Sequence, residues 1–338
     1  MKSGGRASAV ARDAKGEVHP GAERPREDAR RYSLLLAGTL ASRGTGVMTE
    51  PDARDRFLHI ADLHFWRVEW NPLVLMNKRL LGNANVLLKR RHHFHQQHAG
   101  ERLAYIAGLG IPDAILTGDF TSTATPAEFE LAQGFVEELR RNRLDLSLMP
   151  GNHDVYTFES VRRKRYEEYL GNSRPRAGAP LVRRLPGGTP VVMVDTVQAN
   201  YLSSRGHFPA ETEAPLEAML ASLADPLVVA AHYPVLPETY AYRVTPNRAL
   251  ERAEALRRIL GESGKRILYI HGHEHRCSFV QDPEYPQLQH LSTDCLFRHD
   301  PERETEGEIS EIGVHAGGFF VYRHRYWGHW VRESLLPR

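Results

Sequence analysis

The chain has 338 residues, with 44 lysine and arginine residues against 42 aspartate and glutamate residues, and 41% of it is hydrophobic. This composition is typical of a globular protein with a sizeable core, and a formal charge of +2 excludes a surface that binds polyanions over its whole extent. Two cysteines, Cys277 and Cys295, are too few for a disulfide framework or a cysteine-based zinc site, and no apolar run approaches the roughly 18 residues of a membrane span.

The first 47 residues are rich in Gly, Ala, Ser and Arg and contain one short apolar patch, residues 34–37. So little apolar surface cannot offset the entropy of ordering the chain. We therefore expect a disordered tail over residues 1–49 and one domain over residues 50–338. Met48 stands just before the first strand pattern and is a candidate for the true start of the protein.

Short apolar runs predict the buried strands of an α/β domain. They cover residues 57–61, 114–117, 146–149, 191–195, 227–231 and 266–270. Thr125, Pro126 and Glu128 form a capping box with proline at the first helical position, which predicts a helix between the second and third strands. Thr245 and Pro246 predict a similar start for a helix that runs to Leu260, and alternation over 319–322 and 326–331 predicts further sheet.

Five of these strands end in residues that bind metals. They run into Asp62-Leu63-His64, Gly118-Asp119, Gly151-Asn152-His153, His232 and His271-Gly272-His273-Glu274-His275. Ligands bind at the carboxyl ends of strands in open α/β sheets, so we expect these side chains to meet at one edge. Asp62 and His64 are two residues apart and can chelate one ion, and His273 and His275 repeat this arrangement. The motif glycines 118, 151 and 272 allow a close approach of the backbone to an ion.

These motifs (D-x-H, G-D, G-N-H-D, a lone His and G-H-x-H) resemble those of the calcineurin-like metallophosphoesterases, over about residues 56–300. The resemblance implies a four-layer αββα sandwich of two mixed β-sheets flanked by helices, with a centre of two divalent metal ions. It implies that Asp62, His64 and His275 hold the first ion, that Asn152, His232 and His273 hold the second, and that Asp119 bridges both. His153 matches the catalytic histidine of the family.

A centre of this kind implies hydrolysis of a phosphoester or phosphoanhydride bond, by attack of a hydroxide that bridges the two ions. His153, which is not a ligand, would protonate the departing oxygen as a general acid. Nitrogen and oxygen ligands without thiolate suit Mn, Fe or Zn and tolerate Mg, and we expect Mn.

One motif departs from the family pattern, because G-D-x-x-[DN] ends here in Ser122. In relatives the last Asp or Asn of this motif orients the catalytic histidine. Ser122 can still accept a hydrogen bond from an imidazole N–H, but it carries no charge that would raise the basicity of His153. Asp154, next to His153, is an alternative orienting group.

An insertion over residues 66–98 carries a net charge of +5, from six basic residues against Glu69. Leucines 73, 80 and 87 recur every seven residues, which predicts a basic amphipathic element that Gly82 would break into two short helices. Such an element forms a lid or a membrane contact, or it packs its leucines on its own domain. The residues that we expect to contact substrate or an anionic membrane are Trp66, Trp70, Lys78, Arg79, Leu80 and Leu87. The run Arg91-His92-His93-Phe94-His95 offers metal ligands, but we interpret it as a solvated polar stretch.

The insertion is similar to that of some bacterial UDP-2,3-diacylglucosamine pyrophosphohydrolases of lipid A synthesis, which would place a cytoplasmic protein at the inner face of the membrane. An alternative is a cyclic-nucleotide or other soluble phosphodiesterase, which shares the Asn-His-Asp and Gly-His-x-His motifs. A nuclease is disfavoured, because no long basic stripe lies outside the insertion. A non-catalytic binding scaffold is the alternative of another class, although His153 and all seven ligand positions are intact.

Overall fold

A computed structural model describes residues 52–70, 79–80, 82, 93–239 and 246–338. The tail expected over residues 1–49 lies outside these residues, as do Lys78, Leu87 and most of the insertion. Both cysteines are free thiols. Within the described ranges, no helix is long and apolar enough to cross a lipid bilayer.

The first sheet has six strands in the order β14-β13-β12-β1-β2-β3. Its strands are β1 (Asp55–Ile60), β2 (Asp113–Leu116), β3 (Asp145–Leu148), β12 (Glu308–His315), β13 (Gly318–Trp327) and β14 (His329–Leu335). The first three strands are parallel, and the antiparallel β12–β13–β14 meander is joined to β1. The alternation predicted over 326–331 crosses a turn, because β13 ends at Trp327 and β14 begins at His329.

The second sheet also has six strands, in the order β10-β11-β9-β7-β5-β4. They are β4 (Leu181–Arg184), β5 (Pro190–Met193), β7 (Leu227–Ala230), β9 (Ile267–His271), β10 (Ser278–Gln281) and β11 (Leu288–Ser292). Its four central strands are parallel, and β4 and β10 run antiparallel at the two edges. The six strands predicted from apolar runs are therefore all present, three in each sheet.

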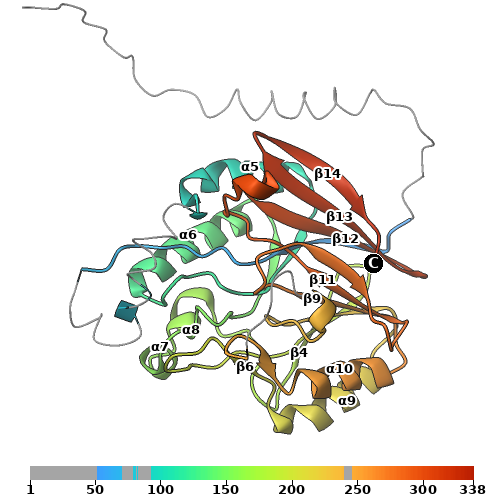
Figure 1. Ribbon diagram of the computed structural model, residues 1–338. Coiled ribbons are helices and arrows are strands. Elements are labelled where there is room, and N and C mark those ends of the chain that lie inside the picture. Colours follow the sequence, from blue (N-terminus) through green and yellow to red (C-terminus); the bar gives the residue numbers. More distant parts are fainter. Residues whose placement is uncertain (1–51, 71–78, 81, 83–92, 240–245) are drawn as a thin grey trace, which may run out of the picture. The chain divides into compact units, whose positions relative to one another are not determined.

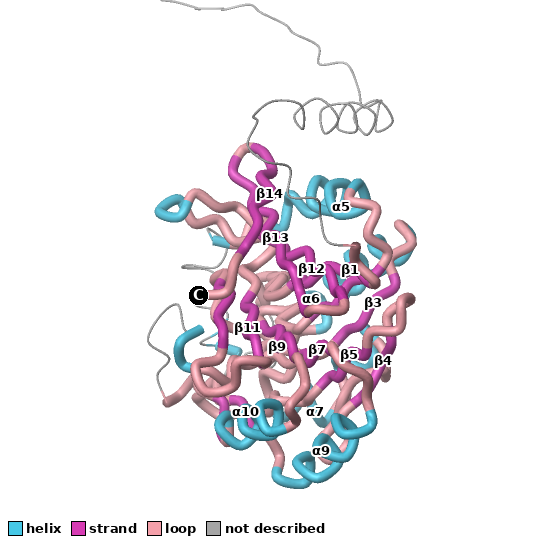
Figure 2. Tube along the Cα trace, turned by 90° about the vertical axis from the view of Figure 1, so that its right-hand side faces the viewer, coloured by secondary structure: helices cyan, strands magenta, loops and turns pink. Residues whose placement is uncertain are grey.

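Helices cover the outer faces of both sheets (Figures 1 and 2). The α-helices are α5 (Ala99–Gly108), α6 (Pro126–Arg141), α7 (Phe158–Arg162), α8 (Arg165–Leu170), α9 (Glu213–Ser222) and α10 (Ala253–Glu262). The 3₁₀ turns are η2 (Gln96–His98), η3 (Ala210–Thr212), η4 (Pro237–Thr239) and η5 (Pro301–Arg303). The predicted capping box at α6 is confirmed, because the Thr125 side chain accepts from Glu128 N–H and the Glu128 carboxylate accepts from Thr125 N–H.

The second predicted helix start is wrong. Pro246 lies in a turn, and α10 begins only at Ala253. Strand pairing takes the intervening residues, because β8 (Leu250–Glu251) pairs in parallel with β6 (Gly206–His207). The Thr-Pro pattern therefore does not begin a helix here, because the residues that follow it pair with a strand that is distant in the sequence.

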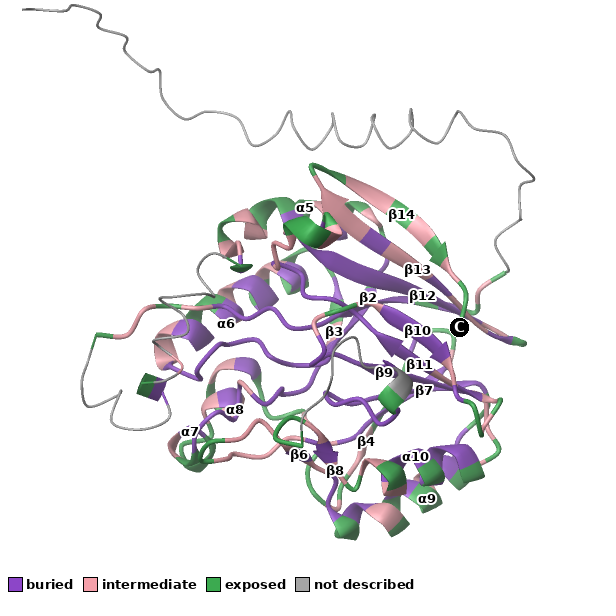
Figure 3. Ribbon diagram, in the orientation of Figure 1, coloured by how far each residue is buried: buried purple, intermediate pink, exposed green. Residues whose placement is uncertain are grey.

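The core lies in three layers of apolar side chains. One fills the space between the sheets and includes Phe57, Ile115, Val228 and Ile270. A second joins the first sheet to α5, α6 and α8, and a third joins the second sheet to α9 and α10. Buried residues accordingly run through both sheets and along the inner faces of the helices (Figure 3). The arrangement is helix, sheet, sheet, helix, which confirms the predicted four-layer sandwich.

Candidate metal centre

The seven predicted ligands are brought together from both sheets. Each follows the carboxyl end of a parallel strand: Asp62 and His64 after β1, Asp119 after β2, Asn152 after β3, His232 after β7, and His273 and His275 after β9. All are buried except His275, which is partly exposed. The parallel strands thus place donor atoms at one edge of the sandwich, as the strand-end pattern predicts.

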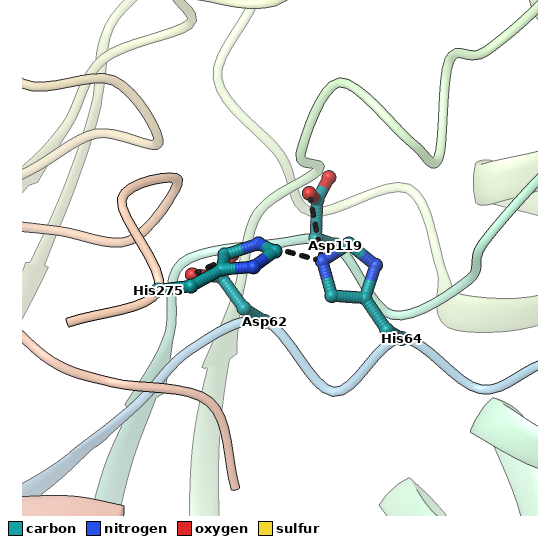
Figure 4. Close-up of side chains that lie close together, drawn as sticks. All are labelled: Asp62, His64, Asp119 and His275. Carbon is teal, nitrogen blue, oxygen red and sulfur yellow. Dashed lines mark hydrogen bonds and ion pairs between the residues drawn. The ribbon is translucent and has the colours of Figure 1, made fainter. Parts of the chain in front are cut away.

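The first group comprises Asp62, His64, Asp119 and His275 (Figure 4). His64 Nε2 lies 2.8 Å from His275 Nε2 and 3.5 Å from Asp119 Oδ2. His275 Nε2 lies 4.0 Å from Asp62 Oδ2. Each of the four residues offers a donor atom within 4.8 Å of the others, a spacing that suits ligands around one ion.

The second group is centred on Asn152. Its Oδ1 lies 3.0 Å from His232 Nε2 and 3.0 Å from His273 Nδ1. His232 Nε2 also lies 3.5 Å from Asp119 Oδ1. One carboxylate oxygen of Asp119 therefore faces each group, which is the placement of a bridging ligand.

The protonation of three histidines tests whether these groups fit a cation. A backbone carbonyl can only accept a hydrogen bond, so the ring nitrogen that faces it must carry the proton. His64 Nδ1 faces the Thr121 carbonyl at 3.3 Å, His232 Nδ1 faces the Thr117 carbonyl at 2.8 Å, and His273 Nε2 faces the Arg248 carbonyl at 3.0 Å. In the neutral form of each ring, the other nitrogen presents a lone pair to the centre of its group. For His232 and His273 that lone pair faces Asn152 Oδ1, and for His232 also Asp119 Oδ1, an arrangement that a cation bound between these atoms would stabilise.

Asp62 gives a second indication of a cation. It is fully buried, and among the described residues no hydrogen bond of normal geometry reaches either of its carboxylate oxygens. Burial raises the pKa of Asp62 well above its usual range, and repulsion from Asp119 raises it further. A divalent cation would remove both penalties, so the ligand set fits the metal ions that the sequence predicts.

Burial also keeps the histidines in the form that binds metals. Desolvation lowers the pKa of His232 to about 4, and it lowers the pKa of His273 well below its usual range. Both rings are therefore neutral at physiological pH, with a lone pair available without the loss of a proton.

The backbone at the centre is strained in a way that marks a functional site. Of the predicted ligands, Asp62, His64, Asp119, His273 and His275 have positive φ angles between 50° and 70°. Left-handed backbone is unfavourable for residues with a side chain and is retained where the surrounding structure enforces it. Packing gives the reason near Asp119: a Cβ atom on Gly118 would lie 2.2 Å from Gly151 N, and one on Gly151 would lie 2.2 Å from Asp119 Oδ1.

His153 lies beside the first group and is held by its backbone and its ring. Its N–H donates to Asp119 Oδ1 at 2.7 Å, and its ring lies 4.9 Å from that of His64, measured between centroids. His153 Nδ1–H donates to the Ser122 carbonyl at 2.6 Å, and the ring stacks on Tyr156. Exchange of a proton with a bound molecule would therefore use Nε2, because Nδ1 is engaged by the Ser122 carbonyl.

The orienting groups differ from those predicted. The backbone carbonyl of Ser122 holds the His153 ring, whereas the Ser122 hydroxyl donates to the His64 carbonyl at 3.2 Å. The Asp154 carboxylate accepts from Gly151 N–H, Phe120 N–H and Thr121 N–H, so it clamps the two ligand loops together. A carbonyl can orient the ring without the side chain that the family motif supplies at this position.

Replacing Ser122 by alanine tests this assignment. We expect Ser122→Ala to lose about 1 kcal/mol of stability, the value of one hydrogen bond, because the bond to the His64 carbonyl is removed. The turnover rate should hardly change, since the carbonyl that orients His153 remains. Denaturant unfolding and steady-state kinetics measure the two effects. A large loss of turnover with unchanged stability would instead make the hydroxyl the orienting group.

The described residues of the insertion are placed in different environments. Trp70 and Leu80 are exposed, at 79% and 57%, as a surface for substrate or membrane requires. Trp66 is half-buried and donates its indole N–H to the Phe94 carbonyl. Arg79 is buried, and its guanidinium binds the Thr123 and Ala124 carbonyls and the Glu159 carboxylate. The predicted surface role of Arg79 is therefore wrong, because its hydrogen-bonding capacity is used inside the fold.

One acidic residue near the centre was missed. Asp294 is buried, and burial together with the Glu308 carboxylate raises its pKa to about 7. Its charge also raises the pKa of Asp62. Asp294 comes two residues after β11, which is a parallel strand. Its position therefore follows the same pattern as the predicted ligands, but the sequence of residues 288–292 was not predicted as a strand.

Comparisons with known proteins agree with the fold described above. A comparison with curated proteins gave no significant match. A dimetal phosphatase from Danio rerio has a similar structure, with a TM-score of 0.58 and 14% identity over 84% of this chain and 99% of that one. A purple acid phosphatase from seeds of yellow lupin, Lupinus luteus, has a TM-score of 0.52 and 10% identity over 80% of this chain and 51% of that one. At such identities these likenesses establish the fold. A family model described as calcineurin-like phosphoesterase matches residues 55–277, and the chain therefore belongs to this family.

Proposed function

We propose that this protein is a metal-dependent phosphohydrolase that cleaves a phosphoester or phosphoanhydride bond. The observation that carries the proposal is the pair of ligand groups joined by Asp119, in which the lone pairs of His232 and His273 face oxygen atoms. We propose two divalent ions there, with Mn as the first candidate and Fe, Zn or Mg as alternatives. When bound, the ions would polarise the phosphoryl oxygens and lower the pKa of a water molecule.

The residues of the chain supply orientation and a proton. The His153 backbone N–H donates to Asp119 Oδ1 and fixes the shared carboxylate. Nδ1–H of His153 is bound to the Ser122 carbonyl, so the protonated ring would give the proton on Nε2 to the departing oxygen and return to its neutral form with Nδ1–H still bound. The neighbouring Tyr156 ring lies nearly parallel to the imidazole and restricts its rotation.

A hydrolysis screen tests the proposal. Protein freed of metal and reloaded with Mn²⁺ would be incubated with an aryl phosphodiester, cyclic AMP and a UDP-linked diacyl sugar. We expect metal-dependent hydrolysis of at least one of the three, and none by Asp119→Ala under the same conditions. Two ions bound without hydrolysis in a broader screen of phosphoesters would favour the non-catalytic scaffold.

For the substrate, we propose an amphiphilic molecule such as a UDP-linked lipid A precursor. Exposed apolar side chains of the insertion, of α7 and of the segment after β5 support this choice: Leu80, Phe158, Val161, Tyr201 and Leu202. Phe158 begins α7 two residues after Tyr156, and its ring contacts that of Tyr201. The exposed Arg162, Arg163 and Lys164 on the same segment would favour an anionic membrane, which we include in the proposal. A soluble cyclic nucleotide is the alternative substrate.

Substitutions at this apolar surface separate the two substrates. We expect Leu80→Ser and Phe158→Ser each to weaken a diacylated UDP-sugar about tenfold, because burying one such side chain contributes about 1.5–3 kcal/mol. Hydrolysis of a small aryl phosphodiester should be unchanged. Leu336→Ser, at a still more exposed leucine near the carboxyl terminus, is the control. If both substrates lose activity alike, the side chains support the fold and the soluble nucleotide becomes the better candidate.

A further inference from the structure

We infer that His95, His299 and Glu306 form a further site for a divalent cation, separate from the centre around Asp119. Each residue offers a donor atom within 4.8 Å of the other two. His299 Nδ1 lies 2.7 Å from Glu306 Oε1, and His95 Nδ1 lies 3.9 Å from the same oxygen. Two imidazoles and a carboxylate are a ligand set that suits zinc and similar borderline cations.

The contacts within the cluster favour a cation over a plain ion pair. His299 Nδ1 is buried and, within the described residues, has no hydrogen bond of normal geometry, although a carboxylate oxygen lies beside it. The His95 and His299 rings are stacked, with centroids 4.7 Å apart and planes 17° apart. A cation bound by one nitrogen of each ring and by Glu306 would use both rings in this arrangement, whereas an ion pair with Glu306 would use only one. Rotation of an imidazole about its terminal torsion is inexpensive, so His95 can turn its lone pair toward a common ion.

The exposure of the three side chains also suits a metal site. Their exposed fractions are 23% for His95, 25% for His299 and 24% for Glu306. An ion could therefore enter from solvent, and a water molecule could complete four-fold coordination. The sequence alone favoured a solvated polar stretch at His95, because His299 and Glu306 come about 200 residues later in the chain.

The backbone holds the two ligand segments together. His95 N–H donates to the Phe297 carbonyl at 2.8 Å, and His299 N–H donates to the His93 carbonyl at 2.7 Å. Between these bonds Phe94 forms an antiparallel bridge with Arg298. The two histidines are thus presented by a short two-stranded ribbon, and Glu306 is held separately, because its N–H donates to the Tyr326 carbonyl at 2.8 Å.

This ribbon also contacts the metal centre. The Phe94 ring lies 4.9 Å from the His64 ring and 6.0 Å from the His275 ring, and Arg298 donates to the His275 carbonyl at 2.8 Å. A cation at His95, His299 and Glu306 would therefore restrict the motion of the ribbon, whose Phe94 and Arg298 contact the ligands His64 and His275. The two sites share no ligand, so the inference does not depend on the proposed reaction.

Counting bound zinc tests the inference. Asp119→Ala protein would be stripped of metal and titrated with Zn²⁺ by calorimetry, with bound zinc measured by elemental analysis after dialysis. We expect one zinc ion per chain to bind in this background, and we expect His299→Gln or Glu306→Gln in the same background to weaken it at least tenfold. Loss of a group that only supports a ligand already costs about 10–100-fold in affinity.

A matched control is available at His207 and Glu251, whose Nδ1 and Oε2 lie 3.2 Å apart without a second histidine in the pair. His207→Gln should leave zinc binding unchanged. Should His299→Gln not fold, as judged by circular dichroism, Glu306→Gln and His95→Gln give the same comparison. The inference is overturned if all folded variants bind as much zinc as the Asp119→Ala parent, or if the parent binds none.

Discussion

Asp119→Ala is expected to lose both of the proposed metal ions and more than about 10³-fold of the activity. Asp119 presents Oδ2 to His64 and Oδ1 to His232, so its loss removes a ligand from both groups at once. Removing a single preorganised electrostatic group from an active site costs about 10²–10³ in turnover, and this change also removes the ions. Elemental analysis and steady-state kinetics on the same preparation measure the two losses.

The melting temperature distinguishes the loss of metal ligands in Asp119→Ala from unfolding of the variant. Asp119 raises the pKa of both Asp62 and Asp154 by charge repulsion, which its removal relieves, while the His153 N–H loses an acceptor. The metal-free variant should therefore melt close to the metal-free wild type. Asp55→Ala is the control, because Asp55 is also buried but binds Gly187 and Thr189, away from the centre. It should lower stability and leave the metal content intact. Full metal and full activity in Asp119→Ala would exclude the shared-ligand assignment.

His153→Ala is expected to keep both ions and lower kcat by about 10²–10⁴, the usual contribution of a positioned proton donor. The ring contributes no atom to either ligand group, so the metal content should not change. The loss should be small for a nitrophenyl ester, whose leaving group departs without a proton, and large for an alkyl ester. Comparing kcat for both esters in wild type and variant measures the difference. An equal loss on both would make His153 a residue that binds phosphate.

Much of the centre could be predicted from the sequence because its residues obey a local rule. Asp62, Asp119 and His232 each follow a short apolar run, and parallel strands that carry such ends must bring them to one edge. The same reasoning does not make every histidine a ligand. His59, within β1, is buried and lies within hydrogen-bonding distance of Thr117 and Thr293, which is an ordinary core environment.

The parts that could not be predicted depend on contacts between distant segments. Arg79 has the sequence context of a surface residue, but Glu159 and two backbone carbonyls bind its guanidinium. No helix begins at Pro246, because β8 pairs instead with β6, which lies some 40 residues earlier in the chain. The role of the Ser122 carbonyl could not be predicted either, because every residue has one and only the fold decides which carbonyl meets His153.

Five residues of the centre have left-handed backbone, which lowers the stability of the fold while it positions their side chains: Asp62, His64, Asp119, His273 and His275. Each such residue costs the folded protein about 1 kcal/mol, a cost that glycine would not incur at the same angles. Replacing any one of these five residues by glycine should therefore relieve backbone strain in the metal-free protein and, at the same time, remove a side chain that we propose as a metal ligand. The same angles that make the fold less stable are thus part of what places the five donor side chains.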